Sequence, residues 1–215
     1  MARIPERPKA PRLSPPDLPA VLEDATGARH GDHLGARIAL GDDLAHAQLE
    51  QCVLHGAADE RADLTGATLL DVAIEEPRTP VLSLRGASVR RLRITGGRIG
   101  TLDLTEARIG ELELRGVRID YATLAAAKAD DVLIAECSFR ALDLPQAVLS
   151  RVRFEDSRAD EVDVRGLRAV DTDLRGLDAL SYLDVLSLKG TTMSAPQVAQ
   201  LAPVLARSLG IDVVD

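Results

Sequence analysis

Four histidines are the residues of this 215-residue sequence whose type and spacing come closest to metal chemistry. His30, His33, His46 and His55 all lie near the N-terminal end. Two residues separate His30 from His33, and with His46 they approach the spacing of a zinc site. Neither cysteine stands at a useful spacing from them. We therefore expect solvated histidines at an edge of the fold, with no metal and no other cofactor.

Nothing else in the sequence is arranged for catalysis. It contains neither a glycine-rich phosphate loop nor the strand-to-helix turn that carries a hydrolase serine. Aspartates are frequent, but they recur because the sequence itself repeats, so pairs of carboxylates do not indicate acid–base chemistry. We expect a protein that is not an enzyme and has no catalytic residues.

A period of five residues organises the elements that would position any site. From Leu44 to Leu174 nearly every fifth residue is large and apolar, and two residues earlier stands a second apolar residue, usually small, such as Ala62. Neither a helix nor an alternating strand fits a period of five, whereas a solenoid does. Two residues in every five then face inward. The series is interrupted at Asp59, Thr79, Ala129, Ala159 and Ala169.

This period resembles the repeat of the pentapeptide-repeat proteins, in which an alanine and an acidic or amide residue precede a central leucine. The resemblance is clearest at residues 62–66, which read Ala-Asp-Leu-Thr-Gly, and covers about residues 42–180. It implies an all-β fold, a right-handed quadrilateral parallel β-helix in which four repeats make one square coil. With strands about 4.8 Å apart, six to seven coils would form a rod about 30 Å long.

The segments around the repeat differ in composition. Residues 1–20 hold six of the eleven prolines and are predicted to form a disordered or extended arm, because proline lacks a backbone donor. Residues 21–41 form a lead-in segment with a poor period, and residues 42–193 form the β-helix. Pro77 and Pro80 predict a local bulge or short loop within it.

The sequence changes character after the repeat. The period slips by one residue near Leu183 and ends at Met193. Residues 194–215 are predicted to hold a helix that starts at the N-cap Ser194 and stops at Gly210. Its apolar stripe indicates a cap on the open end of the β-helix, a homodimer contact, or both. The stripe consists of Val198, Leu201, Ala202, Leu205 and Leu209.

The two cysteines and the overall composition indicate the compartment. Cys52 and Cys137 fall on inward positions more than four coils apart, so we expect buried thiols and no disulfide. No stretch reaches the length of a membrane span, and the N-terminus lacks the apolar part of a secretory signal. Richness in arginine, alanine, aspartate and glycine suggests a bacterial genome. The sequence therefore predicts a bacterial, cytoplasmic protein.

Charged residues form ladders on the outside of such a rod. Residues twenty apart lie on the same face, one coil above another. Residues 41–180 carry 26 acidic and 18 basic side chains, which accounts for the whole net charge of −8. The candidate acidic interaction face consists of Asp43, Asp63, Asp103, Asp143 and Asp163. An adjoining basic ladder consists of Arg78, Arg98, Arg118 and Arg158.

The family resemblance also implies a function. Gyrase-binding pentapeptide proteins of the Qnr and MfpA type are rod-shaped dimers that resemble B-DNA and occupy the DNA-binding surface of a type II topoisomerase. By this resemblance the chain is a non-enzymatic DNA mimic that binds DNA gyrase as a homodimer through its C-terminal helix. Direct nucleic-acid binding is not expected, because a net acidic chain with almost no lysine offers little to phosphates.

Charge density leaves a second function open. B-DNA carries one charge per about 1.7 Å of its axis, whereas one ladder offers at most one per coil of about 4.8 Å. Arginines between the acids dilute it further. The alternative is therefore an interaction scaffold for another protein partner, unrelated to DNA topology. For mimicry, further acids at one corner would have to contribute, namely Asp71, Glu111, Asp131 and Asp171.

Overall fold

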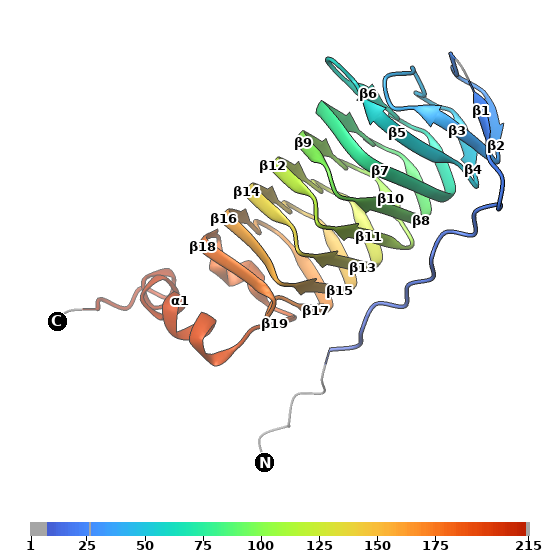
Figure 1. Cartoon of the computed structure of the whole chain (residues 1–215). Coiled ribbons are helices and arrows are strands. Elements are labelled where there is room, and N and C mark those ends of the chain that lie inside the picture. The colour runs from blue at the N-terminus through green and yellow to red at the C-terminus, as the bar shows by residue number, and fades with distance from the viewer. Residues whose placement is uncertain (1–7, 26, 214–215) are drawn as a thin grey trace.

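The computed structural model describes residues 8–25 and 27–213 as a parallel β-solenoid. Strands follow one another around a tube, and those of successive coils pair in parallel within one 19-stranded sheet (Figure 1). In the regular part, Arg108 pairs with Ser88 of the preceding coil and with Lys128 of the next. Each of these steps equals four repeats of five. The predicted all-β, four-sided solenoid is therefore confirmed.

The strands are short, with one exception in β7, and the described part of the chain ends in one α-helix. The elements are β1 (Glu23–Ala25), β2 (Asp32–Leu34), β3 (Ala36–Ala39), β4 (Gln48–Glu50), β5 (Val53–Ala57), β6 (Ala62–Asp63), β7 (Thr68–Ser83), β8 (Ser88–Thr95), β9 (Arg98–Asp103), β10 (Arg108–Ile109), β11 (Leu112–Arg115), β12 (Arg118–Thr123), β13 (Lys128–Ala135), β14 (Ser138–Asp143), β15 (Val148–Glu155), β16 (Ser157–Asp163), β17 (Arg168–Asp173), β18 (Leu177–Leu183), the 3-10 helix η1 (Val185–Leu188), β19 (Thr191–Thr192) and α1 (Ala195–Ser208).

The core is an aliphatic column inside the tube. Leu64, Leu69 and Ile74, at successive positions of the five-residue period, are all buried. Their small partners Ala62 and Ala67 are buried as well. In other repeats both inward residues are large, as with Leu102 and Leu104, so residues of both sizes fill the interior as close packing requires.

Both cysteines lie in this column. Cys52 and Cys137 are buried and free, as predicted. The Cys137 thiol donates to the carbonyl of Ala135 at 3.2 Å. Burial raises the pKa of both thiols. They therefore stay neutral and serve as small core residues.

The first coils are shorter than the later ones, which explains the poor period of residues 21–41. Strand β1 pairs with β3 through Glu23 and Ala36, and β2 pairs with β4 through Asp32 and Gln48. Both steps fall short of four full repeats. The regular step is reached at the bridge between Asp43 and Asp63 and continues in the pairing of β4 with β7.

The prolines of β7 lie inside a continuous strand. A bulge is present, as expected, but it lies in the pairing of β7 with β5, where the register shifts between His55 and Ala57. The alternative of a short loop is wrong, because β7 runs through Pro77 and Pro80 without a break. The next coil makes room for them with glycine: a Cβ on Gly100 would lie 2.4 Å from the Pro80 carbonyl oxygen.

The C-terminal end follows the sequence closely. Thr172 pairs with Thr191, one position short of the regular step, so the predicted slip of one residue is confirmed. Ser194 is the N-cap of α1, since its hydroxyl accepts from the Gln197 N–H while the Gln197 side chain accepts from the Ser194 N–H. The Gln197 amide also donates to the carbonyls of the last full coil. No helix among the described residues is long and apolar enough to cross a membrane.

The N-terminal arm is extended and lies along the outside of the tube (Figure 1). Of the two states predicted for residues 1–20, the structure shows the extended one for residues 8–19, which form neither helix nor strand. Residues 1–7 lie outside the described residues. Backbone N–H groups of the arm donate to acidic side chains of the coils, so the arm has a defined place on the rod.

Candidate protein-interaction faces

The candidate acidic face follows one wall of the tube. Asp63 stands between Asp43 of the preceding coil and Ser83 of the next. Asp143 stands between Thr123 and Asp163 in the same way. The offset of four repeats therefore stacks these positions as predicted. Ser83 and Thr123 interrupt the row, so the face is not a continuous line of carboxylates. Its acids are Asp43, Asp63, Asp103, Asp143 and Asp163.

Most side chains on this wall also cap the turn that follows them, but Asp143 does not, because Pro145 two residues later has no N–H. Asp63 accepts the N–H of Thr65 at 2.9 Å, and Thr123 accepts that of Ala125 at 3.2 Å through its hydroxyl. An aspartate or threonine that accepts the N–H two residues ahead forms an Asx or ST turn. The residue type is therefore selected by the turn as well as by charge. The same contact recurs at Asp43, Asp103 and Asp163.

All five acids of this face have a neighbouring polar side chain. Three of these neighbours are arginines, so much of the negative charge is compensated locally. The other two are a histidine ring and a tyrosine hydroxyl. The pairs are His30 with Asp43 at 3.4 Å, Arg61 with Asp63 at 3.2 Å, Arg85 with Asp103 at 3.0 Å, Tyr121 with Asp143 at 2.6 Å and Arg165 with Asp163.

These contacts keep three of the wall acids, Asp63, Asp103 and Asp163, ionised. Burial acts to raise the pKa of Asp63 and Asp103, but hydrogen bonds from the turn and the adjacent arginine outweigh it and lower the pKa of both. The Arg165 guanidinium lowers the pKa of Asp163. Asp143 acts in the opposite sense on its partner, since its hydrogen bond raises the pKa of Tyr121 to about 12. Asp63, Asp103 and Asp163 therefore contribute to the fold as charged caps.

The net negative charge is concentrated at one end of the rod. Residues 41–76 carry nine acidic side chains and one arginine, whereas residues 77–180 carry 17 of each sign. Residues 41–76, here called the first coils, thus account for the whole excess of negative charge, and the later coils carry equal numbers of acidic and basic side chains. The exposed acids of this end that lie outside the candidate acidic face, here called the N-terminal acid group, are Glu50, Asp59, Glu60, Glu75 and Glu76.

The adjoining wall carries the predicted basic ladder. Arg98 stands between Arg78 and Arg118 of the neighbouring coils, and Ser138 separates Arg118 from Arg158. These four arginines are exposed. Of this ladder, Arg98 is paired, with Asp120 at 3.0 Å. The two walls therefore differ in sign, as the sequence predicts.

The corner acids that would have to strengthen the acidic face are engaged with the N-terminal arm. Each accepts a hydrogen bond from a backbone N–H of the arm. This contact is not predicted by the sequence analysis, since the proline content indicates only an extended chain. The pairs are Lys9 with Asp171 at 3.2 Å, Arg12 with Asp131 at 2.8 Å, Ser14 with Glu111 at 2.9 Å and Asp17 with Asp71 at 3.0 Å.

The apolar stripe of α1 is divided between two surfaces. Leu201 and Leu205 pack against the core of the last coils, together with Val204. Val198 and Leu209 are 45 % and 67 % exposed. Ala202 is exposed as well. Capping therefore uses only part of the predicted stripe, and the remainder faces outward.

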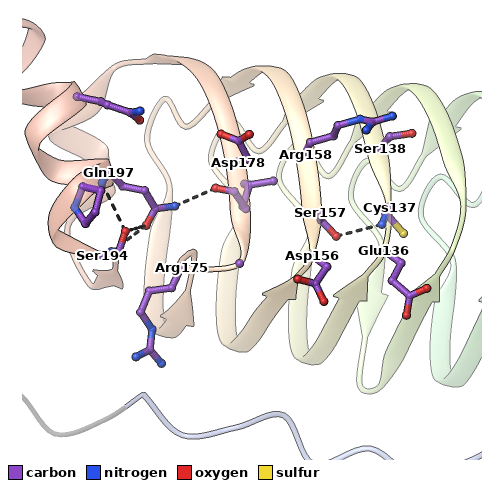
Figure 2. Close-up of a pocket in the computed structure, with 14 residues that line it drawn as sticks. Glu136, Cys137, Ser138, Asp156, Ser157, Arg158, Arg175, Asp178, Ser194 and Gln197 are labelled. Carbon is purple, nitrogen blue, oxygen red and sulfur yellow. Dashed lines mark hydrogen bonds between the residues drawn. The ribbon is translucent and has the colours of Figure 1, made fainter.

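A hollow of about 670 Å³ lies where α1 meets the last coils (Figure 2). Polar side chains that line it form hydrogen bonds with the neighbouring backbone. Ser157 accepts from the Cys137 N–H at 3.1 Å and donates to the carbonyl of Glu155 at 2.8 Å. Ser194 and Gln197 hold the start of the helix. The hollow is therefore the junction between α1 and the last coils of the solenoid.

Two of the four histidines contact backbone carbonyl groups near the N-terminal end of the rod. His30 Nδ1 lies 2.5 Å from the Ala45 carbonyl and His33 Nε2 lies 2.8 Å from that of Arg29. His46 is exposed. Across residues 8–25 and 27–213, no three histidine, cysteine or acidic side chains gather as a metal site would require.

Comparison with known proteins gives a distant likeness. No protein-family model and no curated protein matches the sequence. Two solved, trypsin-treated forms of QnrB1, a plasmid-mediated fluoroquinolone resistance protein, are similar to it. The first is 16 % identical, covers 88 % of this chain and 93 % of its own, and has a TM-score of 0.30. The second is also 16 % identical, covers 87 % and 99 %, and has a TM-score of 0.24. The fold assignment therefore stands on the repeat and the coils of the chain itself.

Proposed function

We propose that this pentapeptide-repeat solenoid is a non-enzymatic rod that acts by binding another protein. The observation that carries the proposal is the uncompensated charge of the first coils. Residues 41–76 contain nine acidic side chains and one arginine, and the N-terminal acid group is exposed. A surface of this kind attracts a partner with a basic surface and speeds its approach.

DNA gyrase is the specific partner we propose. A DNA-binding surface is basic, which suits the acidic end of the rod, and the repeat resembles that of the gyrase-binding family. On this reading the mimicry is local: the acidic end enters the DNA site, and the balanced coils serve as a spacer. The five acids of the candidate acidic face contribute less to binding, because three of them form ion pairs with arginines.

The test is a gyrase supercoiling assay with two matched variants of the full chain. Each variant converts five exposed acids to the corresponding amides, at opposite ends of the rod. We expect inhibition by the wild-type chain at micromolar concentration, its loss in the N-terminal amide variant and its retention in the C-terminal one. No inhibition by the wild-type chain would exclude gyrase. The N-terminal amide variant changes Glu50, Asp59, Glu60, Glu75 and Glu76, and the C-terminal amide variant changes Glu136, Asp156, Asp160, Glu161 and Asp178.

A scaffold for another protein is the second candidate. It is favoured by exposed apolar side chains on the last coil, where Leu180 and Leu186 are 79 % and 53 % exposed. Affinity capture with the full chain, repeated with the N-terminal amide variant, separates the two candidates. A partner other than topoisomerase that is retained equally by both chains would support the scaffold.

We also propose a homodimer through the outward part of the α1 stripe. Val198 and Leu209 are exposed, and burying apolar area is the main driving force of association. Sedimentation should show a dimer for the wild-type chain and a monomer for Leu209→Glu. The control is Ser208→Glu, which adds the same charge at an exposed polar position of the same helix. A wild-type monomer would contradict the proposal.

A further inference from the structure

The N-terminal arm and one corner of the tube form a matched pair. The corner, here called the corner track, contributes one charged side chain from each coil, and four of the acids accept backbone N–H groups of the arm. The arm runs from the last coils back to the first, as Figure 1 shows in dark blue. The corner track consists of Asp71, Arg91, Glu111, Asp131, Arg151 and Asp171.

The arm and the corner track have the same pitch. From Lys9 to Asp17 the arm advances eight residues, while the acceptors step five coils, from Asp171 to Asp71. Eight residues of a polyproline-type chain rise about 25 Å. Five coils rise about 24 Å. Donors and acceptors therefore stay in step along the whole contact.

Prolines in the arm fall where no donor is needed. Five of the thirteen residues from 8 to 20 are proline, yet the four donors are Lys9, Arg12, Ser14 and Asp17. Proline has no N–H, so a proline at any of these four positions would remove the bond. The residue before each donor is half-buried against the rod. These residues are Pro8, Pro11, Leu13 and Pro16.

Two of the four acceptors are also held by arginines of the next coil. Arg151 pairs with Asp131 at 2.7 Å, and Arg91 pairs with Asp71. The arginine lowers the pKa of each carboxylate, and the N–H of the arm lowers it further. Both acids are therefore ionised acceptors in a fixed orientation, which strengthens their hydrogen bonds.

We propose that the corner track is a binding site for an extended, proline-rich polypeptide segment, and that the chain's own arm fills it in cis. Recognition uses backbone N–H donors spaced three, two and three residues apart, with apolar or proline residues just before them. Because the arm lies at the surface and buries no side chain fully, the contact is reversible. The arm thus competes with any partner that would use the corner acids. This holds whichever partner the walls of the rod bind.

Amide hydrogen exchange on the full-length chain tests the cis contact directly. The N–H groups of Lys9, Arg12 and Ser14 should exchange at least about tenfold more slowly than that of Ala10, which has no acceptor among the described residues. The protection should not change with protein concentration. Equal exchange at all four sites would overturn the proposal, and protection that rises with concentration would assign the track to the arm of a second copy.

A peptide in trans tests whether the track is a site. In the full chain, Arg12→Pro with Ser14→Pro removes two donors and frees the track, while Ala10→Pro adds proline at a position that donates no bond. A labelled peptide of residues 8–20 should bind the double variant at least about tenfold more tightly than the wild-type or Ala10→Pro chain. The same peptide carrying the two prolines should not bind. Equal binding to all three chains, or none to the double variant, would overturn the proposal.

The acceptors can be tested without changing the arm. Asp131→Asn removes one charged acceptor, and Asp156→Asn makes the same change at an exposed corner position that lacks the arm. Both residues have left-handed backbones, with φ of 52° and 44°, which asparagine tolerates. Trypsin should cut after Lys9 and Arg12 several-fold faster in Asp131→Asn, and at the wild-type rate in Asp156→Asn. Equal rates in the two variants would contradict the assigned acceptor.

Discussion

The first full coils and the later coils of the rod share one repeat, but their acidic side chains have different surroundings. In residues 77–180 every acid is balanced in number by a basic side chain, and pairs such as Arg151 with Asp131 join neighbouring coils. Residues 41–76 contain nine acidic side chains and one arginine. The period of five determines which side chains face inward, whereas the three outward positions are free to vary. Function is therefore expected where the outward charge is left uncompensated.

A core substitution should show that the two regions are alike inside. Leu49 of the first coils and Leu102 of the later coils are both buried, at 1 % and 0 % exposure. Leu49→Ala and Leu102→Ala should each lower the free energy of unfolding by about 2 to 5 kcal/mol, since each leaves a cavity. Urea unfolding measures both. A cost below about 1 kcal/mol for Leu49→Ala alone would show that the first coils do not belong to the common core.

The turn caps should separate the two regions. The Asp163 side chain is 3 % exposed, whereas that of Asp43 is 61 % exposed. Asp163→Ala should cost about 1 to 2 kcal/mol of unfolding free energy, because it leaves a turn N–H and a guanidinium without their acceptor. Asp43→Ala should cost less than about 0.5 kcal/mol. Equal losses in thermal unfolding would remove the distinction between buried and exposed caps.

Acid should weaken the paired coils. Arginines lower the pKa of Asp131, Asp163 and Asp173 in the folded chain. The unfolded state then binds more protons than the folded state at low pH, so stability rises with pH in this window. The contribution is complete above the ordinary aspartate pKa of about 3.9 and is lost as the pH falls through the lowered values. The urea midpoint should be level from pH 7 to 5 and fall below about pH 4. A midpoint unchanged at pH 2.5 would contradict the role of these pairs.

The exposed acids should matter least for stability. Glu75→Gln with Glu76→Gln changes two exposed side chains of the first coils. Because surface charges contribute little to folding, the free energy of unfolding should change by less than about 0.5 kcal/mol. Thermal unfolding measures this change. A loss above about 1 kcal/mol would mean that these acids serve the fold, as the wall aspartates do.

The sequence predicts what depends on the period and little of what depends on side-chain pairing. Inward residues such as Leu64, the stacking of wall positions and the N-cap Ser194 follow from spacing alone. The local compensation of the wall acids does not, because an arginine such as Arg85 reaches an acid 18 residues away on the next coil. The docking of the arm also escapes prediction, since it needs two segments up to 162 residues apart to agree in pitch.

The shortened first coils are a further case. Their pairings, such as Glu23 with Ala36, span fewer than four full repeats, so a fixed period cannot reveal them. A search for gaps of unequal length between apolar residues such as Ile38 and Leu54 would reveal the change. Turn chemistry is recognisable at Asp63, because an acidic residue stands two positions before the N–H that it accepts. An acidic interaction face and a turn cap would both have aspartate at this position, so spacing alone does not distinguish the two roles.

The dissociation constant of the complex between the full chain and gyrase tests the central claim most directly. It should be measured at one fixed salt concentration for the wild-type chain and for the N-terminal and C-terminal amide variants. We predict a loss of affinity of at least about tenfold for the N-terminal amide variant and of less than about threefold for the C-terminal one. Equal losses in the two variants would contradict the claim that the uncompensated acids of the first coils form the binding surface.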